Sequence, residues 1–468
     1  MQDLFGGAPL VIVTAAGLLT LLSESVSPKS LSVQWWIALA GLAAAGTAGW
    51  ASVTGRTEVF SGMLTSGGSA GYWSIVFCAA GLLCVMLSKG YLKRQQIAQG
   101  EYYTLVLFGV AGMMLMAAAA DLIVFFLGLE LMSLCFYVLA GFARTRMASN
   151  EAALKYFLLG AFSTGFLLYG IALLYGATGT THIASLALTA ASPPPLFTVG
   201  LALVLIGLSF KVAAVPFHMW VPDVYEGSPT TVSAFMSTGG KAAAFSGLLL
   251  IFTPALVSVV QPLRDVLAVV AALSMVAGNI LAVSQASIKR MLAYSSIAHA
   301  GYILSGVVAA NATGSSGVMY YLLAYTMMNA GAFGVLALEE SEQGGNLTYD
   351  EYAGFGLRRP LLAALMAVFM FSLAGVPPFA GFFGKYYVFA GAIQAGYTWL
   401  AILGVVMSVV SAYYYLRLVV MMYFKEGSRT AGTPAPVAGV FALVLAALAL
   451  LGLGVLPSTV LNITRVLF

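Results

Sequence analysis

The sequence predicts an all-α polytopic membrane protein with about fourteen transmembrane helices. Of the 468 residues, 61% are hydrophobic and only 8% are charged, whereas a soluble domain has about 25% charged residues. A spanning helix needs about 20 predominantly apolar residues, and fourteen runs of this kind occupy most of the chain. Their expected bounds are 8–22, 33–53, 70–89, 103–119, 121–142, 152–175, 197–219, 230–253, 262–284, 290–310, 318–338, 361–391, 398–423 and 435–460.

Lysine and arginine are distributed between the loops in a way that predicts the topology. The odd-numbered loops contain eleven of them, namely Lys29, Lys93, Arg94, Arg144, Arg146, Lys289, Arg290, Arg358, Arg359, Lys425 and Arg429. The even-numbered loops and the C-terminal segment contain three, Arg56, Arg264 and Arg465. Because cytoplasmic loops carry an excess of basic residues, we expect the odd loops to be cytoplasmic and both termini to lie on the non-cytoplasmic side.

A glutamate and four lysines lie within the predicted spans, where charged side chains are rare. Inserting one charged side chain at membrane depth costs about 2.5–3.5 kcal/mol on insertion scales, so by default such residues mark an ion or proton path. They are Glu130, Lys155, Lys211, Lys241 and Lys385. A chain of such groups bridged by water would conduct protons, because a nearby carboxylate changes how tightly a buried lysine holds its proton. The sequence therefore predicts an ion-handling membrane protein.

Some of these residues also have a purely structural interpretation. In the structural interpretation, Glu130 would be a protonated carboxyl group that makes a single hydrogen bond. Lys155 lies near a helix end with Glu151 four residues before it, as in a helix-end ion pair. His299 and His218 lie in or beside apolar runs. Histidine can relay protons because its ordinary pKa lies near neutrality, but a lone histidine in a bundle is as often a hydrogen-bonded core residue.

Two of the predicted helices contain prolines that should break them. Pro216 interrupts the run at 197–219, and Pro377 with Pro378 interrupts the run at 361–391. Proline removes a backbone donor and clashes with the preceding turn. Irregular backbone at membrane depth is tolerated only when it is buried in protein or faces a water-filled cavity. Each break has a lysine close by in sequence, so we expect both breaks to lie beside the ion path.

The spacing of the two breaks predicts an internal repeat. They lie five runs apart, and a tandem unit with an odd number of helices must be inverted in the membrane, as in many transporters. We therefore expect inverted five-helix repeats at 101–255 and 256–425, preceded by an N-terminal three-helix segment at 1–100. One C-terminal helix at 426–468 completes a single membrane domain.

The sequence lacks the motifs of cofactor binding. Cys78, Cys84 and Cys135 all lie in apolar runs without a CxxC spacing, and an ordinary iron–sulfur cluster needs four cysteines. No dinucleotide-binding GxGxxG follows a predicted strand, and no phosphate-binding GxxxxGK(S/T) occurs. We expect this chain to bind no cofactor and no metal, so any redox or nucleotide chemistry belongs to another chain.

Five motifs resemble one known family in the same order along the chain. They are FFLGLELMSLCFYVLAGFAR, EAALKYFLLGAFSTGFLLYG, FKVAAVPFHMWVPDVYEGSPTTVSAFMSTGGKAAAF, IKRMLAYSSIAHAGY and LAGVPPFAGFFGKYYVF. This series resembles the subunit N family of bacterial proton-translocating NADH:quinone oxidoreductase (respiratory complex I), whose mitochondrial homologue is subunit 2. The wider family includes the antiporter-like subunits M and L, membrane-bound hydrogenase subunits and multisubunit cation/proton antiporters.

The resemblance implies a role for each charged residue in the spans. Glu130 matches the fifth-helix glutamate and Lys211 the seventh-helix lysine, which pair in the family. Lys155 matches the sixth-helix lysine and Lys241 the central eighth-helix lysine. Lys385 matches the terminal lysine on the exit side. The further candidates for the proton relay are His299 and His218.

The resemblance also implies a function and its partners. Electron transfer from NADH to quinone is expected in partner subunits that hold FMN, iron–sulfur clusters and quinone, while this chain moves protons across a bacterial inner membrane. The expected neighbours are the antiporter-like subunit M, the small subunits J and K, and lipid, with no nucleic acid. The alternatives are a subunit of a multisubunit cation/proton antiporter or membrane-bound hydrogenase, and a passive membrane scaffold.

Overall fold

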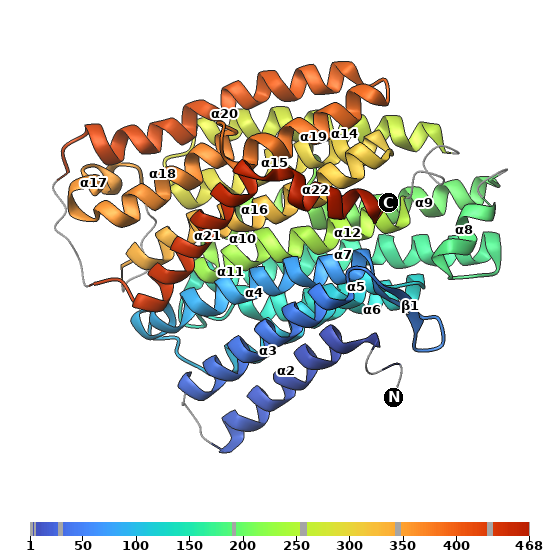
Figure 1. Cartoon of the computed structure of the whole chain (residues 1–468), viewed down its shortest axis with the longest axis horizontal. Helices are drawn as coiled ribbons and strands as arrows, with labels where there is room; N and C mark the ends of the chain where they lie inside the picture. Colours follow the sequence, from blue (N-terminus) through green and yellow to red (C-terminus); the bar gives the residue numbers. More distant parts are fainter. Residues whose placement is uncertain are drawn as a thin grey trace.

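The chain folds into a bundle of long helices that run along the long axis of the molecule, horizontal in Figure 1. Thirteen of the described helical segments are long and apolar enough to span a membrane. The prediction of an all-α polytopic membrane protein is therefore confirmed. The computed structural model describes residues 3, 6–26, 31–189, 193–252, 260–341, 348–427 and 434–467. Of the basic loop residues, Lys29 and Arg429 lie outside the described residues.

Most predicted runs form a single helix. The first six are α2 (Ala8–Val26), α3 (Leu31–Ser52), α4 (Ser69–Arg94), α5 (Glu101–Ala118), α6 (Leu122–Ala140) and α7 (Met147–Thr178). The ninth, tenth, eleventh and thirteenth are α14 (Gln261–Val283), α15 (Ile288–Ala309), α16 (Ala312–Glu339) and α20 (Thr398–Phe424). Shorter helices in the connections are α8 (Ile183–Thr189), η2 (Asp350–Tyr352) and α17 (Phe355–Arg358).

The seventh and twelfth runs are broken where their prolines predict. The seventh is divided into α9 (Pro195–Val212) and α10 (Trp220–Gly227), and the twelfth into α18 (Pro360–Ala374) and α19 (Ala380–Gln394). The residue after each first half has a left-handed backbone, with φ of +66° at Ala213 and +88° at Gly375. At Gly375 a Cβ atom would also lie 3.1 Å from Lys385 Cδ. Both the backbone and the close approach of this lysine therefore favour glycine there.

The eighth run has an irregularity that was not predicted. It is divided into α11 (Thr230–Phe235), the π-helix η1 (Met236–Gly240) and α12 (Lys241–Ile251). π-helical turns inside α-helices are rare and are often found at functional sites. This one ends in two consecutive glycines, but hydrophobicity alone does not distinguish a π turn from an α turn. Lys241 is the first residue after it.

The fourteenth run ends in a second, amphipathic helix. The single helix expected at 435–460 is instead α21 (Val437–Val455) followed by α22 (Pro457–Val466). Pro457 cannot donate a backbone hydrogen bond to the helix before it, so it begins a new one. In α22 the side chains of Leu461 and Thr464 are buried, while the remaining residues of this helix are partly or fully exposed.

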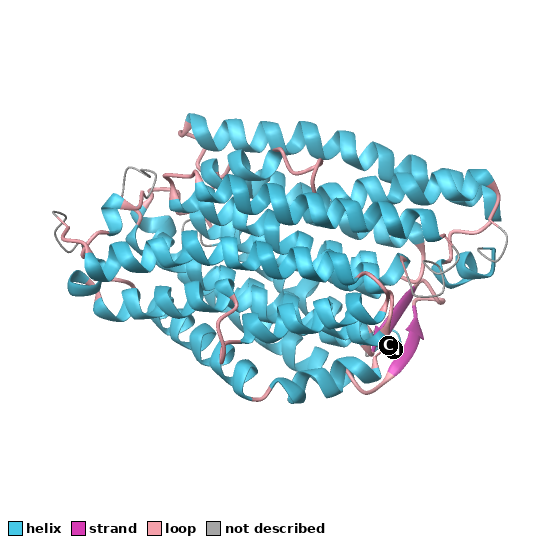
Figure 2. Ribbon diagram, turned by 90° about the horizontal axis from the view of Figure 1, so that it is seen from above, coloured by secondary structure: helices cyan, strands magenta, loops and turns pink. Residues whose placement is uncertain are grey.

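One connection forms strands rather than the loop that was expected. Strands β1 (Arg56–Val59) and β2 (Leu64–Gly67) pair antiparallel, with Arg56 opposite Gly67, as Figure 2 shows in magenta. The turn passes through three residues with positive φ, the last of them Gly62. A hydrogen bond of 3.0 Å from the Phe60 amide to Asp3 Oδ1 ties the turn to the N-terminal segment. Each strand has four residues, too few to give a clear alternating pattern in the sequence.

The fourth and fifth runs, which nearly touch in the sequence, form a tight helical hairpin. The first of these helices, α5, ends at Ala118, and α6 begins at Leu122. Asp121 caps α6, because its Oδ1 accepts a hydrogen bond of 2.7 Å from the Ile123 amide. A side-chain cap of this kind satisfies one of the free amides of the first helical turn.

The described ends of the helices lie at two opposite ends of the bundle, in the order that the alternation of loops predicts. At one end, Arg94 beside the third loop donates to the Ala337 carbonyl near the eleventh loop. At the other end, Thr65 Oγ1 of the second loop donates at 3.2 Å to the Ala118 carbonyl beside the fourth. Figure 1 places both termini at this second end. The first end, which holds the odd loops, is called the basic end below.

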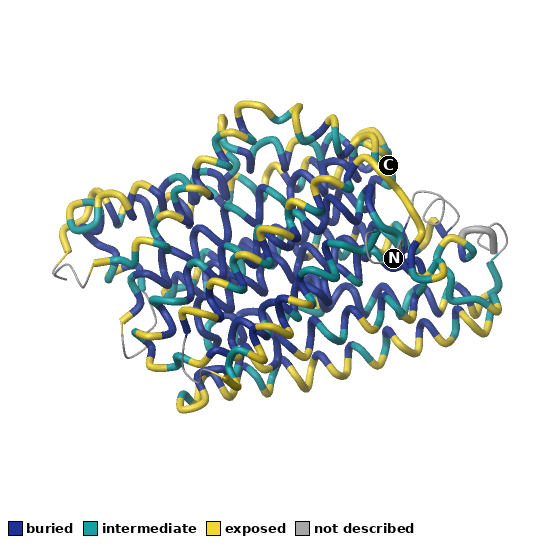
Figure 3. Tube along the Cα trace, turned by 60° about the horizontal axis from the view of Figure 1, so that its bottom comes forward, coloured by how far each residue is buried: buried dark blue, intermediate teal, exposed yellow. Residues whose placement is uncertain are grey.

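The interior is formed by helices that carry several of the predicted site residues. The eighth run, α15 and α16 are buried over most of their length. Figure 3 shows this as a dark blue centre with exposed residues along the outer helices. In contrast, α7 and α20 expose large apolar side chains such as Phe162 and Val409. Exposed apolar residues of this size mark a surface that lipid or another protein covers.

Candidate functional site

Lys211 is buried against the fifth predicted helix. It lies in the last turn of α9, just before the break, and only 7% of its surface is exposed. Its Nζ donates to Ser133 Oγ at 2.7 Å and to Tyr137 OH at 3.5 Å, both on α6. The aromatic ring of Tyr137 lies 5.6 Å from the same nitrogen. These groups are all uncharged.

Glu130 lies one turn before Ser133 on α6 and is partly exposed. Its Oε1 accepts a hydrogen bond of 3.0 Å from Thr164 Oγ1 of α7. Within the described part of the chain, no ion pair of 4.0 Å or less joins Glu130 to Lys211. Ser133 instead contacts the lysine and lies one turn from the glutamate. The two residues expected to pair therefore lie near one another without direct contact.

Lys155 lies at the surface of the basic end rather than in the interior. Its side chain is 41% exposed, and Nζ lies 2.7 Å from Glu151 Oε1 and 2.8 Å from Asp223 Oδ2. Arg290 contacts the other oxygen of Asp223 at 2.9 Å. This geometry matches the helix-end ion pair considered above and extends it to α10 and α15. Partial burial acts to raise the pKa of Asp223, but hydrogen bonds from Lys155 and Arg290 outweigh it and hold that pKa below its ordinary value.

Lys241 lies at the centre of the bundle and is 1% exposed. Its Nζ donates to both the carbonyl and the hydroxyl oxygen of Ser296 on α15, each at 2.6 Å. The π turn ends at Gly240, so the irregular turn leads directly into the residue that makes these contacts. As with Lys211, the acceptors are uncharged.

His299 lies one turn after Ser296 on α15. Its Nδ1 is 2.7 Å from Tyr321 OH and its Nε2 is 3.0 Å from Tyr415 OH. The Tyr415 hydroxyl also shares a hydrogen bond with Ser295 Oγ. Both ring nitrogens are thus held by hydroxyl groups, which can donate or accept. The arrangement places His299 within one helical turn of the serine that binds Lys241.

Lys385 lies beside the second break and is 5% exposed. Its Nζ donates at 2.9 Å to the carbonyl of Ala374, the last residue of α18. The end of a helix leaves such carbonyls without a helical partner. The nitrogen also lies 4.9 Å from the centre of the Tyr302 ring. Lys385 lines a cavity of about 700 Å³ between α19 and α20, together with Tyr386 and Val405.

A second hydrogen-bond chain adjoins Lys385. Asn279 Nδ2 donates to Tyr302 OH at 2.8 Å, and Tyr414 OH donates to Asn279 Oδ1 at 2.9 Å. The chain therefore links α14, α15 and α20 in the second half. His218, by contrast, lies partly buried in the connection between α9 and α10. Among the described residues, no side-chain hydrogen bond joins His218 to another predicted site residue.

Sequence reasoning missed the neutral residues that surround the charges. Ser133, Thr164 and Ser296 each bond to a charged site residue. One signal is present in the sequence, because Ser133 follows Glu130 by three residues and Ser296 precedes His299 by three, which is helical spacing. The contacts between helices have no such signal. The described residues contain no cluster of three or more His, Cys, Asp or Glu side chains that could hold a metal.

Comparisons with known proteins agree on one family. A family model described as NADH:quinone oxidoreductase/Mrp antiporter, TM matches residues 119–411. NADH-quinone oxidoreductase subunit N of Trichlorobacter lovleyi is 49% identical over 98% of this chain and 95% of its own length. Subunit N 1 of Chloroherpeton thalassium is 46% identical over 99% of this chain and 98% of its own length.

Solved structures are similar over nearly the whole chain. A chain of respiratory complex I from Thermus thermophilus, solved with bound aureothin, has a TM-score of 0.85 at 37% identity and covers 97% of this chain and 98% of its own. A chain of the Mrp complex from Dietzia has a TM-score of 0.88 at 22% identity, covering 99% of this chain and 96% of its own. At 22% identity the likeness concerns the fold alone.

Proposed function

Because the chain belongs to the NADH-quinone oxidoreductase subunit N family, we propose that its buried lysines carry protons through the membrane. It is a multi-pass subunit of the membrane arm of this translocase. Electron transfer in partner subunits supplies the energy, and this chain contributes the path for the protons. The side chains proposed to form that path are Glu130, Lys155, Lys211, His218, Lys241, His299 and Lys385.

One observation carries the proposal: three of the buried lysines, all of them predicted site residues, are held by uncharged oxygens. Lys211 donates to Ser133, Lys241 to Ser296 and Lys385 to a main-chain carbonyl. Among the described residues, none of the three has a carboxylate within 4.0 Å. Buried charges in proteins are normally paired. A proton can therefore leave and return to each of these amines without breaking an ion pair.

The contacts also support an order for the relay. Lys155 and Glu130 belong to the first half, and Lys211 binds the serine one turn after Glu130. In the second half, Ser296 and His299 on one helix lie between Lys241 and the hydroxyl of Tyr415. Lys385, beside the second break, is the last member. Hydroxyl groups both donate and accept, so they are suited to link these steps.

The two broken helices support the proposed inverted repeats at 101–255 and 256–425. In each unit the fourth helix is divided, its first half is followed by a left-handed residue, and a buried lysine lies beside the break. Segments 1–100 and 426–468 flank the repeats. Ion sites of transporters with inverted repeats lie at such discontinuous helices. The repeat would therefore give the chain two related half-paths that meet near Lys241.

We propose that the chain lies in the bacterial inner membrane, and the distribution of charge supports placing its basic end in the cytoplasm. The odd loops, which carry the excess of Lys and Arg, gather at this end. Both termini would then lie on the non-cytoplasmic side. Protons that enter at the basic end and leave beside Lys385 would cross in the outward direction.

Membership of the family supports specific partners. We propose that the antiporter-like subunit M and the small subunits J and K are neighbours of this chain in the membrane arm, with lipid around the remaining surface and no nucleic acid. FMN, iron–sulfur clusters and quinone belong to partner subunits in this proposal. The three cysteines of this chain are buried free thiols.

The test is a substitution of the central lysine in the assembled complex. Lys241→Ala should reduce NADH-driven proton pumping in reconstituted vesicles by about tenfold or more, because a positioned proton-transfer group is lost. Assembly of the complex should be unchanged. Lys89→Ala is a matched control, since Lys89 lies over the Trp35 ring on α4, a helix with none of the proposed residues. Normal pumping by Lys241→Ala would contradict the proposal.

A further inference from the structure

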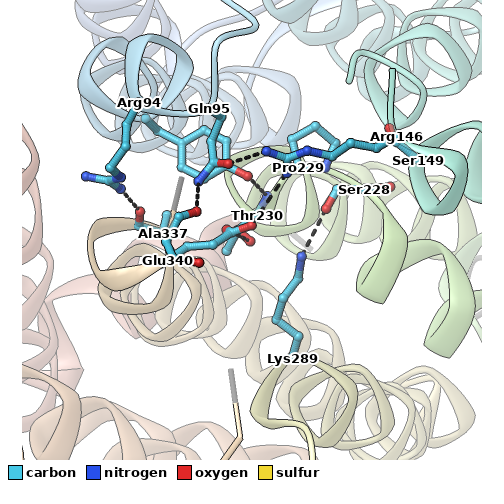
Figure 4. A network of polar contacts seen from close by, with 12 residues as sticks. Arg94, Gln95, Arg146, Ser149, Ser228, Pro229, Thr230, Lys289, Ala337 and Glu340 are labelled. Carbon is cyan, nitrogen blue, oxygen red and sulfur yellow. Dashed lines mark hydrogen bonds and ion pairs between the residues drawn. The ribbon is translucent and has the colours of Figure 1, made fainter. Parts of the chain in front are cut away.

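A buried carboxylate that is not among the proposed relay residues lies at the basic end. Glu340 directly follows α16 and is 4% exposed. Its Oε2 accepts a hydrogen bond of 2.5 Å from Thr230 Oγ1, and its Oε1 lies 4.0 Å from Arg146 Nη1. Figure 4 shows that these side chains converge from separate helices. Hydrophobicity does not indicate this cluster, because Glu340 lies in a loop between two predicted spans.

Further hydrogen bonds hold this carboxylate at the start of the eighth run. Arg146 also donates to Gln95 Oε1, and Gln95 Nε2 donates to the Ser341 carbonyl at 2.8 Å. The Thr230 amide donates to Tyr91 OH at 3.0 Å. Because Thr230 is the first residue of α11, Glu340 is held at the N-terminal end of the helix that leads to Lys241.

Where α16 packs against the eighth run, the contact of Glu340 with Thr230 and a second polar contact about two turns deeper define a line that points into the bundle. On α16, Asn329 precedes Glu340 by eleven residues, or about three turns at 3.6 residues per turn. On the facing helix, Ser237 follows Thr230 by seven residues, or about two turns. Asn329 Nδ2 donates to Ser237 Oγ at 2.8 Å. Lys241 lies about one further turn along the same helix.

Two buried oxygen atoms along this line have no hydrogen-bond partner among the described residues. One is Asn329 Oδ1, and the other is Ser228 Oγ in the link before Thr230. Both side chains are buried. Buried polar atoms are almost always satisfied by protein or by ordered water, and a polar site with several partners is where water is held. These two atoms therefore indicate hydrated positions, one near the outer end of the line and one deeper in the bundle.

We infer that Glu340 is the uptake point of a second proton route, which runs between α16 and the eighth run to Lys241. This inference rests on the proposed function, because it gives Lys241 a supply that bypasses Lys211. A protonated Glu340 would pass its proton to a neighbouring water, and each hydroxyl or water on the line would accept one proton and release another. Lys241 accepts the last one, and Glu340 returns to a carboxylate that Arg146 stabilises until it is reprotonated from the basic end.

Neighbouring cations suit this role. Lys289 is buried and donates to the Ser228 carbonyl at 3.0 Å, so a positive charge holds the link that precedes Thr230, whose hydroxyl binds the carboxylate. Arg94 donates to the Ala337 carbonyl about one turn before Glu340. Both cations bind main-chain oxygens, so they hold the backbone in place and leave the Glu340 carboxylate available to exchange a proton.

Two substitutions test the route, one at its start and one within it. Glu340→Gln keeps an oxygen that accepts from Thr230 but cannot release a proton, and Asn329→Leu fills the line with an apolar side chain of similar size. Each should lower pumping severalfold per NADH oxidised in vesicles containing the whole complex, and the double variant should be no worse than either alone. Glu340→Asp, which can still titrate, should recover part of the loss.

The matched control is the neighbouring carboxylate. Glu339 pairs with Arg359 at 3.3 Å, so Glu339→Gln removes the same charge from the same helix end at a carboxylate with a different partner. Normal pumping by both Glu340→Gln and Asn329→Leu would overturn the route, as would equal losses in Glu339→Gln and Glu340→Gln. Should Glu340→Gln assemble poorly, Asn329→Leu and Ser237→Ala decide the question.

The central lysine separates this inference from the proposed function. Loss of pumping in Lys241→Ala alongside normal pumping in Glu340→Gln and Asn329→Leu would reject the second route and leave the proposed function standing. Normal pumping in all three variants would reject both.

Discussion

At the scale of single residues, the buried lysines differ from ordinary buried cations in their partners. A buried ammonium is normally paired with a carboxylate, since an unpaired buried charge costs several kcal/mol. Here Lys211, Lys241 and Lys385 donate to hydroxyl or carbonyl oxygens. Glu130 lies within one helical turn of the serine that binds Lys211. To pair with Glu130, Lys211 would have to exchange its contact with Ser133 for one with the carboxylate.

This geometry leads to a prediction about Glu130 and Lys211. Glu130→Gln and Lys211→Ala should each reduce proton pumping by about tenfold, with little loss of assembled complex. The double variant should be less impaired than the product of the two single effects, because residues that interact show non-additive losses. Pumping and quinone reductase activity in vesicles measure this.

Ser133 provides the control for that pair. Ser133→Thr keeps the hydroxyl that accepts from Lys211 and should pump close to the normal rate, whereas Ser133→Ala should be impaired. Strictly multiplicative losses in the Glu130 and Lys211 double variant would show that the two residues act independently.

At the scale of elements, the second half of the broken seventh helix is held by charges on its neighbours. Asp223 on α10 contacts Lys155 of α7 and Arg290 of α15. A further contact of α10 is the hydrogen bond of 3.1 Å from Ser287 Oγ to Glu226 Oε2. The ion pairs therefore help to set the position of α10 relative to the break that follows Lys211.

We predict that Asp223→Asn loosens α10 without unfolding the bundle. Exposed ion pairs contribute little to stability, so the loss of thermal stability should be small, while protease cleavage near α10 should become severalfold faster. The pKa of Asp223 is held below its ordinary value. The stabilisation that the ionised Asp223 side chain provides is therefore fully present at pH values above the ordinary pKa of aspartate. It is lost as the pH falls through the lowered pKa of Asp223. The wild-type protein should therefore resist cleavage throughout the neutral pH range.

Asp350→Asn is a suitable control for this experiment. Asp350 is an exposed aspartate in η2, on the eleventh loop of the same end. Equal protease sensitivity of Asp223→Asn and Asp350→Asn across neutral pH would show that the ion pairs do not hold α10.

At the scale of the whole molecule, the alternation of loops defines two ends with different charge. Odd loops meet through hydrogen bonds such as Arg94 to Ala337 and Gln95 to Ser341. Even loops meet at the other end with the strands and both termini (Figure 1). The basic loop residues are therefore concentrated at one end of the long axis, although the net charge of the chain is only +4.

The topology gives the last prediction. Reporter domains fused after Arg94, Arg146 and Arg290 should be cytoplasmic, because basic loops remain on that side. A fusion after Arg465 should lie on the opposite side. A cytoplasmic C-terminal fusion would contradict both the expected fourteen spans and the direction of transport proposed above.

Signals that are local in the sequence were sufficient for the order and the breaks of the helices. Each span is an apolar run, and its length is set by the thickness of the bilayer. A break follows from proline chemistry within a few residues, as at Pro216 and Pro377. The strands at 56–67 and the π turn before Lys241 were missed because both depend on weak, short patterns that hydrophobicity does not distinguish.

Which charges lie in apolar runs can also be read from the amino-acid sequence, because such a charge is visible without a structure. What each of these charges contacts depends on how the helices pack in the folded chain. Lys241 and Ser296 are 55 residues apart, and Thr230 and Glu340 are 110 apart. Such contacts depend on how helices pack, and no periodicity within one helix encodes them. For the same reason Lys155 lies in an apolar run of the sequence but at the surface of the fold, where an aspartate of another helix binds it.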